Sequence, residues 1–119
     1  MRRAWLVAAA LGAACAAPAP PSVTAEIACV PLARALSQLC TVTLTDRATG
    51  RPVEGAKVTL SADMPSMPLA HSVRPVAAAP AAAGVYRGTL ELEMTGRWVI
   101  AARVTGPLTD QFTRVVDID

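Results

Sequence analysis

The sequence is poor in the residue types from which catalytic sites are built. Its 119 residues include a single histidine, His71, and only four aromatic side chains. General acid–base and nucleophilic catalysis require at least two cooperating groups within reach of each other. No serine, cysteine or carboxylate stands near His71 in a recognisable catalytic arrangement. We therefore expect no catalytic residues and no enzymatic activity.

An excess of positive charge is also missing from most of the chain. The formal net charge is +2, and the surplus is carried by Arg2 and Arg3 at the start of the sequence. From residue 17 onward, nine basic residues are balanced by nine acidic ones. A nucleic-acid partner requires a basic patch that neutralises phosphates, and binding to an anionic membrane surface requires a similar cluster. The charge balance argues against both.

The apolar run at the start of the chain is too short to cross a membrane. Residues 4–14 are apolar without interruption, but this run of about 11 residues falls well short of the roughly 20 that a spanning helix needs. Arg2 and Arg3 precede it, and small residues and prolines follow it, which is the layout of a secretory signal peptide. We expect a signal peptide over residues 1–16 and a periplasmic or otherwise extracytoplasmic protein.

Two positions for the end of this signal remain open. Residues 14–16 form a small-x-small site whose cleavage leaves Ala17 as the first mature residue. Residues 11–15 instead resemble, imperfectly, a bacterial lipobox. In that alternative the signal is residues 1–14 and Cys15 is acylated, so the lipid is the protein's only attachment to the membrane.

The cysteines support export. There are three, and because Cys15 is either removed or acylated, Cys29 and Cys40 remain as a pair. We expect them to form a disulfide in an oxidising compartment, with a contribution of about 3 kcal/mol to stability. A thiol metal site or redox site is the alternative, although the spacing is not CxxC and neither cysteine neighbours His71.

Beyond the signal, most of the sequence alternates between apolar and polar residues. Residues 17–28 are expected to form a flexible tether, followed by the folded domain over residues 29–119. Residues 31–37 fit either a short helix or the start of a strand that leads into Cys40. Residues 62–84 contain four prolines and break the alternation, so we expect a long connection or an irregular edge there.

The alternating runs place their apolar residues on one face. The residues predicted to face inward are Val42 and Leu44; Val58 and Leu60; Tyr86, Gly88, Leu90, Leu92 and Met94; Trp98, Ile100, Ala102 and Val104; and Phe112, Val116 and Ile118. Short alternating strands with turns between them, and no convincing long helix, indicate an all-β, antiparallel sandwich. We expect its two largest rings, Trp98 and Tyr86, to pack close together.

One segment carries the chemistry that the sequence offers. Residues 64–71, M-P-S-M-P-L-A-H, hold two of the three methionines beyond the signal and the only histidine. Thioether sulfur is a soft ligand that favours Cu(I), and imidazole also suits copper. The prolines favour a polyproline II backbone with about three residues per turn, which projects Met64 and Met67 from one side. His71 follows a little over one turn later, so Met64, Met67 and His71 are candidate metal ligands.

A structural explanation of the same residues remains open. Methionine commonly fills gaps in apolar cores, so Met64 and Met67 can instead cap one end of the sandwich. A lone histidine is more often a surface or hydrogen-bonded residue than a ligand. A further sulfur, Met94, is predicted to face inward and to belong to the core.

The order of these motifs resembles a known family. The segment PVEGAKVTLSADMPSMPLAH is followed, after a spacer, by GVYRGTLELEMTGRWVIAARV. Over about residues 39–106 this order resembles the YtkA-like domain family, which is related to FixH-type proteins. The most specific part of the resemblance is the MPxMP loop with a downstream M-x-G-x-W. It implies an exported immunoglobulin-like sandwich, often membrane-associated, of the kind found around bacterial copper and respiratory-oxidase systems.

Two functions from different classes follow. The first is an exported accessory protein that binds Cu(I) through Met64, Met67 and His71 or hands it over. Its partners would be copper-transport or oxidase-assembly membrane proteins, and copper is the one cofactor suggested. The second is a non-metal interaction or scaffolding module of a membrane-associated assembly, in which the same loop packs structurally or docks a partner.

Overall fold

The described part of the chain consists of seven β-strands. The computed structural model describes residues 22–66 and 73–119. The strands are β1 (Val23–Pro31), β2 (Ser37–Asp46), β3 (Lys57–Asp63), β4 (Val73–Ala82), β5 (Val85–Glu91), β6 (Gly96–Thr105) and β7 (Asp110–Ile118). They follow the order β1-β2-β5-β4-β3-β6-β7, and every pairing is antiparallel. The predicted all-β, antiparallel fold is confirmed.

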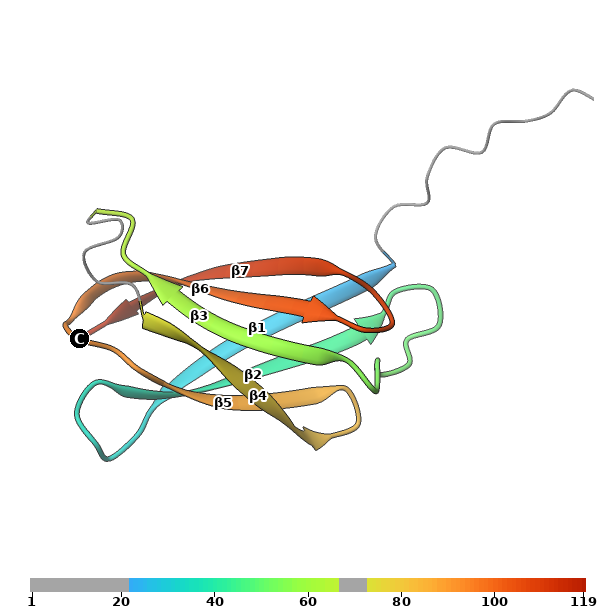
Figure 1. Ribbon diagram of the computed structural model, residues 1–119, viewed down its shortest axis with the longest axis horizontal. Coiled ribbons are helices and arrows are strands. Elements are labelled where there is room, and N and C mark those ends of the chain that lie inside the picture. The colour runs from blue at the N-terminus through green and yellow to red at the C-terminus, as the bar shows by residue number, and fades with distance from the viewer. Residues whose placement is uncertain (1–21, 67–72) are drawn as a thin grey trace, which may run out of the picture.

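The strands form the two layers of an immunoglobulin-like sandwich (Figure 1). One layer contains β1, β2 and β5, and the other contains β3, β6 and β7. Strand β4 joins them, because residues 73–78 pair with β3 and residues 79–82 pair with β5. The shared strand closes one side of the sandwich. On the other side the two edge strands, β1 and β7, lie next to each other.

The core lies between the layers and is built from the predicted inward-facing residues. Val42, Leu44, Val58, Leu60, Leu90, Ile100, Ala102 and Val104 are all buried. Phe112, Val116 and Ile118 of β7 are partly buried and pack against this core. The period-two alternation therefore predicted β2, β3, β5, β6 and β7 and the faces that they bury.

The two large rings anchor different ends of the core. Trp98 and Tyr86 are both buried, as predicted. The Tyr86 hydroxyl donates to the Val53 carbonyl at 2.8 Å, just before β3 begins. Trp98 Nε1 donates to the Met94 carbonyl at 3.1 Å, close to the end of the sandwich at which β3 finishes. These hydrogen bonds lie near opposite ends of β3, which does not support the expected close packing of the two rings.

The folded domain starts earlier than residue 29. Residues 23–28, which the sequence analysis placed in a flexible tether, lie in β1, which pairs with β2 along its whole length. Val23 and Ile27 are buried in the core. The small Ala25 stands between them on the same face, which weakened the alternation and made the segment read as a continuation of the alanine-rich region before it.

The residues between β1 and β2 form a turn, so the short helix considered for residues 31–37 is wrong. The amide of Leu32 donates to the Ser37 carbonyl at 2.9 Å, and the amide of Ser37 donates to the Arg34 carbonyl at 3.1 Å. Leu36 has φ 63°, a left-handed conformation that interrupts a helix. The alternative, a strand leading into Cys40, is confirmed because β2 begins at Ser37.

Residues 62–84 contain more regular structure than their prolines suggested. Strand β3 continues to Asp63, and β4 is a ten-residue strand rather than a connection. Proline interrupts a ladder of hydrogen bonds and is tolerated at bulges or unpaired positions. Pro80 adjoins the register shift between β4 and β5, and Pro75 lies in the part of β4 that has no pairing with β5.

Candidate functional site

Met64 is the one candidate metal ligand that lies within the described residues. It follows β3 directly, and its side chain is buried in the core with a relative exposure of 3%. Its Cε is close to Gly96, where an added Cβ would approach it to 2.9 Å. Met67 and His71 lie outside the described residues, so the three-ligand site remains a prediction. For Met64 the geometry supports the core-filling role that was left open.

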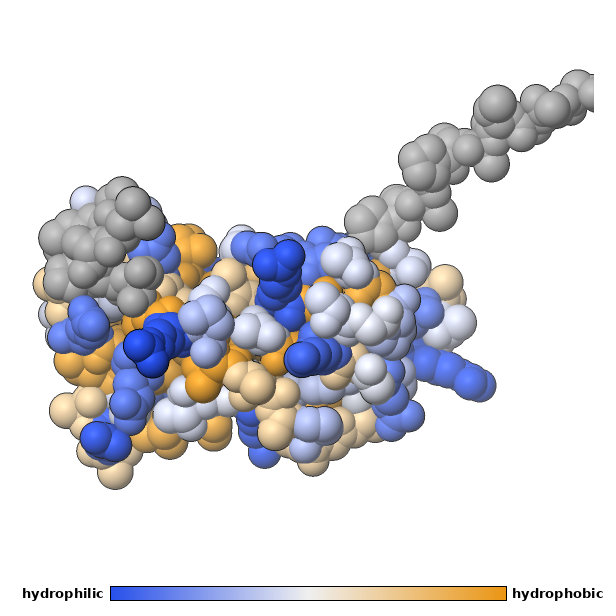
Figure 2. Space-filling model, in the orientation of Figure 1, coloured by the Kyte–Doolittle hydropathy of each residue, from blue (hydrophilic) through white to orange (hydrophobic). Residues whose placement is uncertain are grey.

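Met94 lies at the same end of the sandwich. Its carbonyl accepts the hydrogen bond from Trp98, and its side chain is partly buried against the core, as predicted. It precedes Gly96, the residue next to the Met64 methyl group, by two positions. On the face shown in Figure 2, hydrophobic residues gather toward this end, near the point at which β3 finishes. Two thioether side chains therefore lie at the end of the core at which β3 finishes.

The other metal-ligand types are not clustered. In residues 22–66 and 73–119, no group of three or more histidine, cysteine, aspartate or glutamate side chains is arranged to hold a metal ion.

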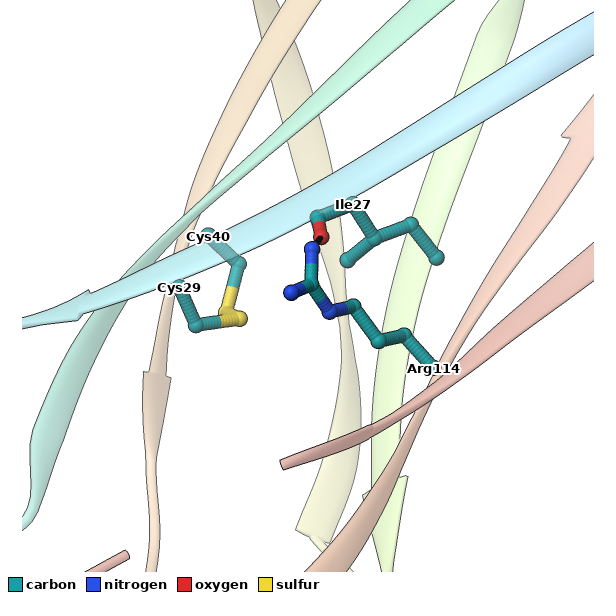
Figure 3. Close-up of a disulfide and its surroundings, with 4 residues drawn as sticks. All are labelled: Ile27, Cys29, Cys40 and Arg114. Carbon is teal, nitrogen blue, oxygen red and sulfur yellow. Dashed lines mark hydrogen bonds between the residues drawn. A yellow bond between two sulfur atoms is a disulfide. The ribbon is translucent and has the colours of Figure 1, made fainter. Parts of the chain in front are cut away.

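Cys29 and Cys40 form the expected disulfide (Figure 3). They stand directly opposite each other in the β1–β2 ladder, with a Cα–Cα distance of 4.1 Å. Cys40 is fully buried. Cys15, the candidate acylation site, and the predicted signal lie outside the described residues. Strand β1 lies at the edge of the sheet and has a backbone ladder only with β2. The disulfide adds a covalent bond between these two strands.

The charged groups on the surface form ordinary exposed ion pairs. Glu91 pairs with Arg34 at 3.1 Å, and Arg97 pairs with Asp117 at 3.1 Å. Arg34, the partner of Glu91, lies in the turn between β1 and β2, so this pair links that turn to the end of β5.

One polar residue of this region was missed by the sequence analysis. Asp63 is the last residue of β3 and lies immediately before Met64. Its Oδ1 is buried and has no hydrogen-bond partner, the one such side-chain atom in the part of the chain that the structure describes. Alternation alone marks Asp63 as an outward-facing residue of a strand. Nothing in the sequence signals that one of its oxygens is shielded from water.

The chain belongs to the YtkA-like family, whose sequence pattern matches residues 23–103. The match covers more than half of the chain and begins at β1, which the resemblance in sequence had left out. Searches among curated proteins and among solved structures find no match. Membership of this family indicates an accessory domain.

The described residues also contain no helix that is both long enough and apolar enough to cross a membrane.

Proposed function

We propose that this protein is an exported accessory protein that binds Cu(I) through residues 64–71 and hands it over to a membrane-bound partner. The proposed ligands are Met64, Met67 and His71. The partners would be copper-transport or oxidase-assembly membrane proteins. Membership of the YtkA-like family supports the accessory role. The Cys29–Cys40 disulfide supports export, because such bonds persist in oxidising compartments.

The observation that carries the metal proposal is the position of Met64. Its thioether lies at the boundary between the core and the segment that contains the other two ligands. Thioether and imidazole ligands together favour Cu(I), and a hydrophobic surrounding limits the access of water to such a site. Met64 would hold one side of the ion from the rigid domain, and the segment after it would supply the remaining ligands.

A second candidate function is favoured by the same residue. Met64 is 3% exposed and packs against the position of Gly96, so it already has a structural task in the core. In this alternative the protein is a non-metal interaction or scaffolding module, and residues 64–71 form part of a docking surface. The two functions differ in whether the sulfur and imidazole atoms are required.

A Cu(I) competition titration separates the two functions. The exported protein is titrated against a coloured Cu(I) chelator, together with the variants Met64→Leu, Met67→Leu and His71→Ala. Leucine preserves the volume of methionine and removes the sulfur, so Met64→Leu tests the ligand without emptying the core. Each variant should weaken Cu(I) binding by at least about tenfold, the scale on which groups around a metal site act.

Met94→Leu is the matched control, because Met94 lies at the same end of the sandwich but belongs to the core. It should leave the Cu(I) affinity unchanged. If the triple variant at positions 64, 67 and 71 binds Cu(I) as the natural protein does, the copper function is wrong and the interaction module stands.

Export and anchoring are tested separately by the intact mass of the protein recovered from its native compartment. An unmodified chain that begins at Ala17 excludes the lipid anchor. A chain that begins at acylated Cys15 establishes it. A full-length chain that retains Met1 and Arg2 in the cytoplasm would contradict export itself.

A further inference from the structure

A shallow depression lies on the outer face of the β3-β6-β7 layer. It has a volume of about 380 Å³ and is lined by Ser61, Asp63, Pro65, Val99, Ala101, Gln111 and Thr113. Two cross-strand rows form its floor. In one row Ser61 pairs with Ala101, which pairs with Thr113. The small alanine at the centre of that row leaves room for an incoming group.

The depression contains a carboxylate that the fold does not satisfy. Oδ1 of Asp63 is buried and has no hydrogen-bond partner. A buried acceptor without a donor lowers stability, and this holds more strongly for a charged acceptor than for a neutral one. The terminal torsion of aspartate is broad, so rotation of the carboxylate brings either oxygen into the depression. The carboxylate oxygen that is not buried lines the depression and can accept from a donor outside the chain.

The surroundings of Asp63 are apolar on one side and polar on the other. In its own row Asp63 pairs with Val99, which pairs with Val115, and Val115 is 55% exposed. Pro65 and Ala101 add further apolar surface. Gln111 and Thr113 contribute acceptor oxygens from β7. A complementary group therefore has an aliphatic body and an end with several donors and positive charge.

An arginine side chain has this chemistry. Its methylene groups pack on apolar surface while its guanidinium group reaches a carboxylate. The guanidinium presents five N–H donors in a planar fork, so it can bond Asp63 and also oxygens such as those of Gln111 and Thr113. Another carboxylate of this layer, that of Asp117, is already paired with Arg97. Asp63 is thus the carboxylate of this face that is left for a partner.

We propose that this depression is a docking site for an arginine side chain of a partner protein. The aliphatic part of the arginine lies over Ala101 and Val99, and its guanidinium donates to the Asp63 carboxylate. The inference does not depend on copper. Asp63 and Pro65 flank Met64 in the sequence, so a partner bound here would lie beside this proposed ligand.

The site is tested with a blocked tripeptide, acetyl-Ala-Arg-Ala-amide, titrated into the isotope-labelled protein and followed by amide NMR shifts. The matched probe carries citrulline in place of arginine and differs in charge but not in shape. Shifts confined to the lining residues, with at least about tenfold weaker binding of the citrulline peptide, support the proposal, since a charge-assisted hydrogen bond is lost. Scattered shifts, or equal binding of both peptides, overturn it.

Two variants complete the test. Asp63→Asn keeps the shape of the side chain and should abolish the localised shifts, whereas Asp117→Asn, on the same layer, should preserve them. Asp63→Asn should also leave the thermal midpoint unchanged or raise it, because it removes the charge from a carboxylate whose buried Oδ1 has no donor. A lowered midpoint together with retained peptide binding would show that Asp63 serves the fold alone. Self-association of the free protein through this face, lost in Asp63→Asn, would identify a second copy as the occupant and overturn the proposed partner.

Discussion

Arg114 of β7 donates a hydrogen bond from Nη1 to the backbone carbonyl of Ile27 in β1, across 87 positions of sequence. Figure 3 shows the guanidinium reaching toward β1 from the neighbouring strand. Six successive antiparallel pairings separate β1 from β7 in the sheet order, so the two strands run in the same direction. In the part of the chain that the structure describes, no backbone ladder joins them. A side chain provides the link at this open side of the sandwich.

Removal of this link should loosen the open side of the sandwich. We expect Arg114→Ala to lower the free energy of unfolding by about 1 kcal/mol. This is less than a buried hydrogen bond to a charged group contributes, because Arg114 is exposed. Urea unfolding measures the change. Amide hydrogen exchange in β1 should also become faster, since β1 loses its hydrogen bond from β7.

Arg103→Ala is the control for this prediction. Arg103 is an exposed arginine on β6, an inner strand of the same layer. Its removal should change stability by less than about 0.5 kcal/mol, as is usual for surface substitutions. Equal effects of the two variants would mean that the bond to Ile27 does not hold the edge strands together.

The disulfide is the second element that holds β1 in place. The double variant Cys29→Ala with Cys40→Ala should lower the free energy of unfolding by about 3 kcal/mol, because the unfolded chain regains the freedom of the closed loop. The two cysteines are 11 positions apart in sequence. Thermal melting of the natural protein with and without a dithiol reductant should show a shift in the same direction. Identical midpoints under both conditions would contradict a structural role for the bond.

The strands were predictable wherever one face of a strand is apolar and the other polar. In β2 the sequence Thr-Val-Thr-Leu-Thr alternates without exception, and Val42 and Leu44 are buried as expected. Strand β4 shows why the alternation of apolar and polar residues does not predict every strand. It passes between the layers, its first half pairs with β3 and its second half with β5, and neither half has a regular apolar face. Its burial depends on tertiary neighbours that alternation does not encode.

The candidate site was predictable only as a list of ligand types. Soft ligands in residues 64–71 are visible in the sequence, but the depth of Met64 in the core depends on Gly96, which is 32 positions later. Asp63 was missed for a related reason. A carboxylate on the outer face of a strand is expected to be solvated, and the shielding of its Oδ1 arises only after β3, β6 and β7 are assembled.

Arg114 illustrates the same limit for the fold. It occupies a position between Phe112 and Val116, both of which face the core. A charged residue in the middle of an apolar face contradicts the pattern, so the sequence alone offers no role for it. Its role follows from the position of β1 next to β7. The aliphatic part of the side chain covers the edge while its charged end reaches the Ile27 carbonyl.

The hydroxyl of Tyr86 should contribute measurably to stability. It accepts a hydrogen bond from the Ala56 amide at 3.2 Å and donates one to the Val53 carbonyl at 2.8 Å, so it fixes the segment that leads into β3. Tyr86→Phe leaves both backbone groups without this partner and should lower the free energy of unfolding by about 1–3 kcal/mol. Urea unfolding is the measurement.

Thr24→Val is the control for Tyr86→Phe, because it also removes one hydroxyl group. Thr24 Oγ1 donates to the Thr45 carbonyl at 3.4 Å, a long bond at an exposed site. This variant should change stability by less than about 0.5 kcal/mol. If Tyr86→Phe behaves in the same way, the hydroxyl of Tyr86 does not fix the segment before β3, and the ring alone accounts for the burial of this residue.

Two glycines with nearly the same backbone conformation should respond differently to alanine. Gly50 has φ 72° and Gly84 has φ 70°, so each alanine variant pays about 1–2 kcal/mol for a left-handed residue with a side chain. At Gly50 nothing lies within 4 Å of the added Cβ. At Gly84 the Cβ would come within 2.6 Å of the Pro52 Cβ and 2.8 Å of the Leu44 carbonyl oxygen. The turn between β4 and β5 would have to move away from β2 to make room.

We therefore expect Gly50→Ala to lower the free energy of unfolding by about 1–2 kcal/mol. Gly84→Ala should lower it by about 2–5 kcal/mol, because the added methyl group also overpacks the contact with Pro52 and Leu44. Urea unfolding of the two variants side by side gives the difference. The Leu44 amide donates to the Gly84 carbonyl at 2.8 Å, so its hydrogen exchange should become faster in Gly84→Ala alone. Equal losses in the two variants would show that the conformation at position 84, and not its contact with Pro52, is what requires glycine.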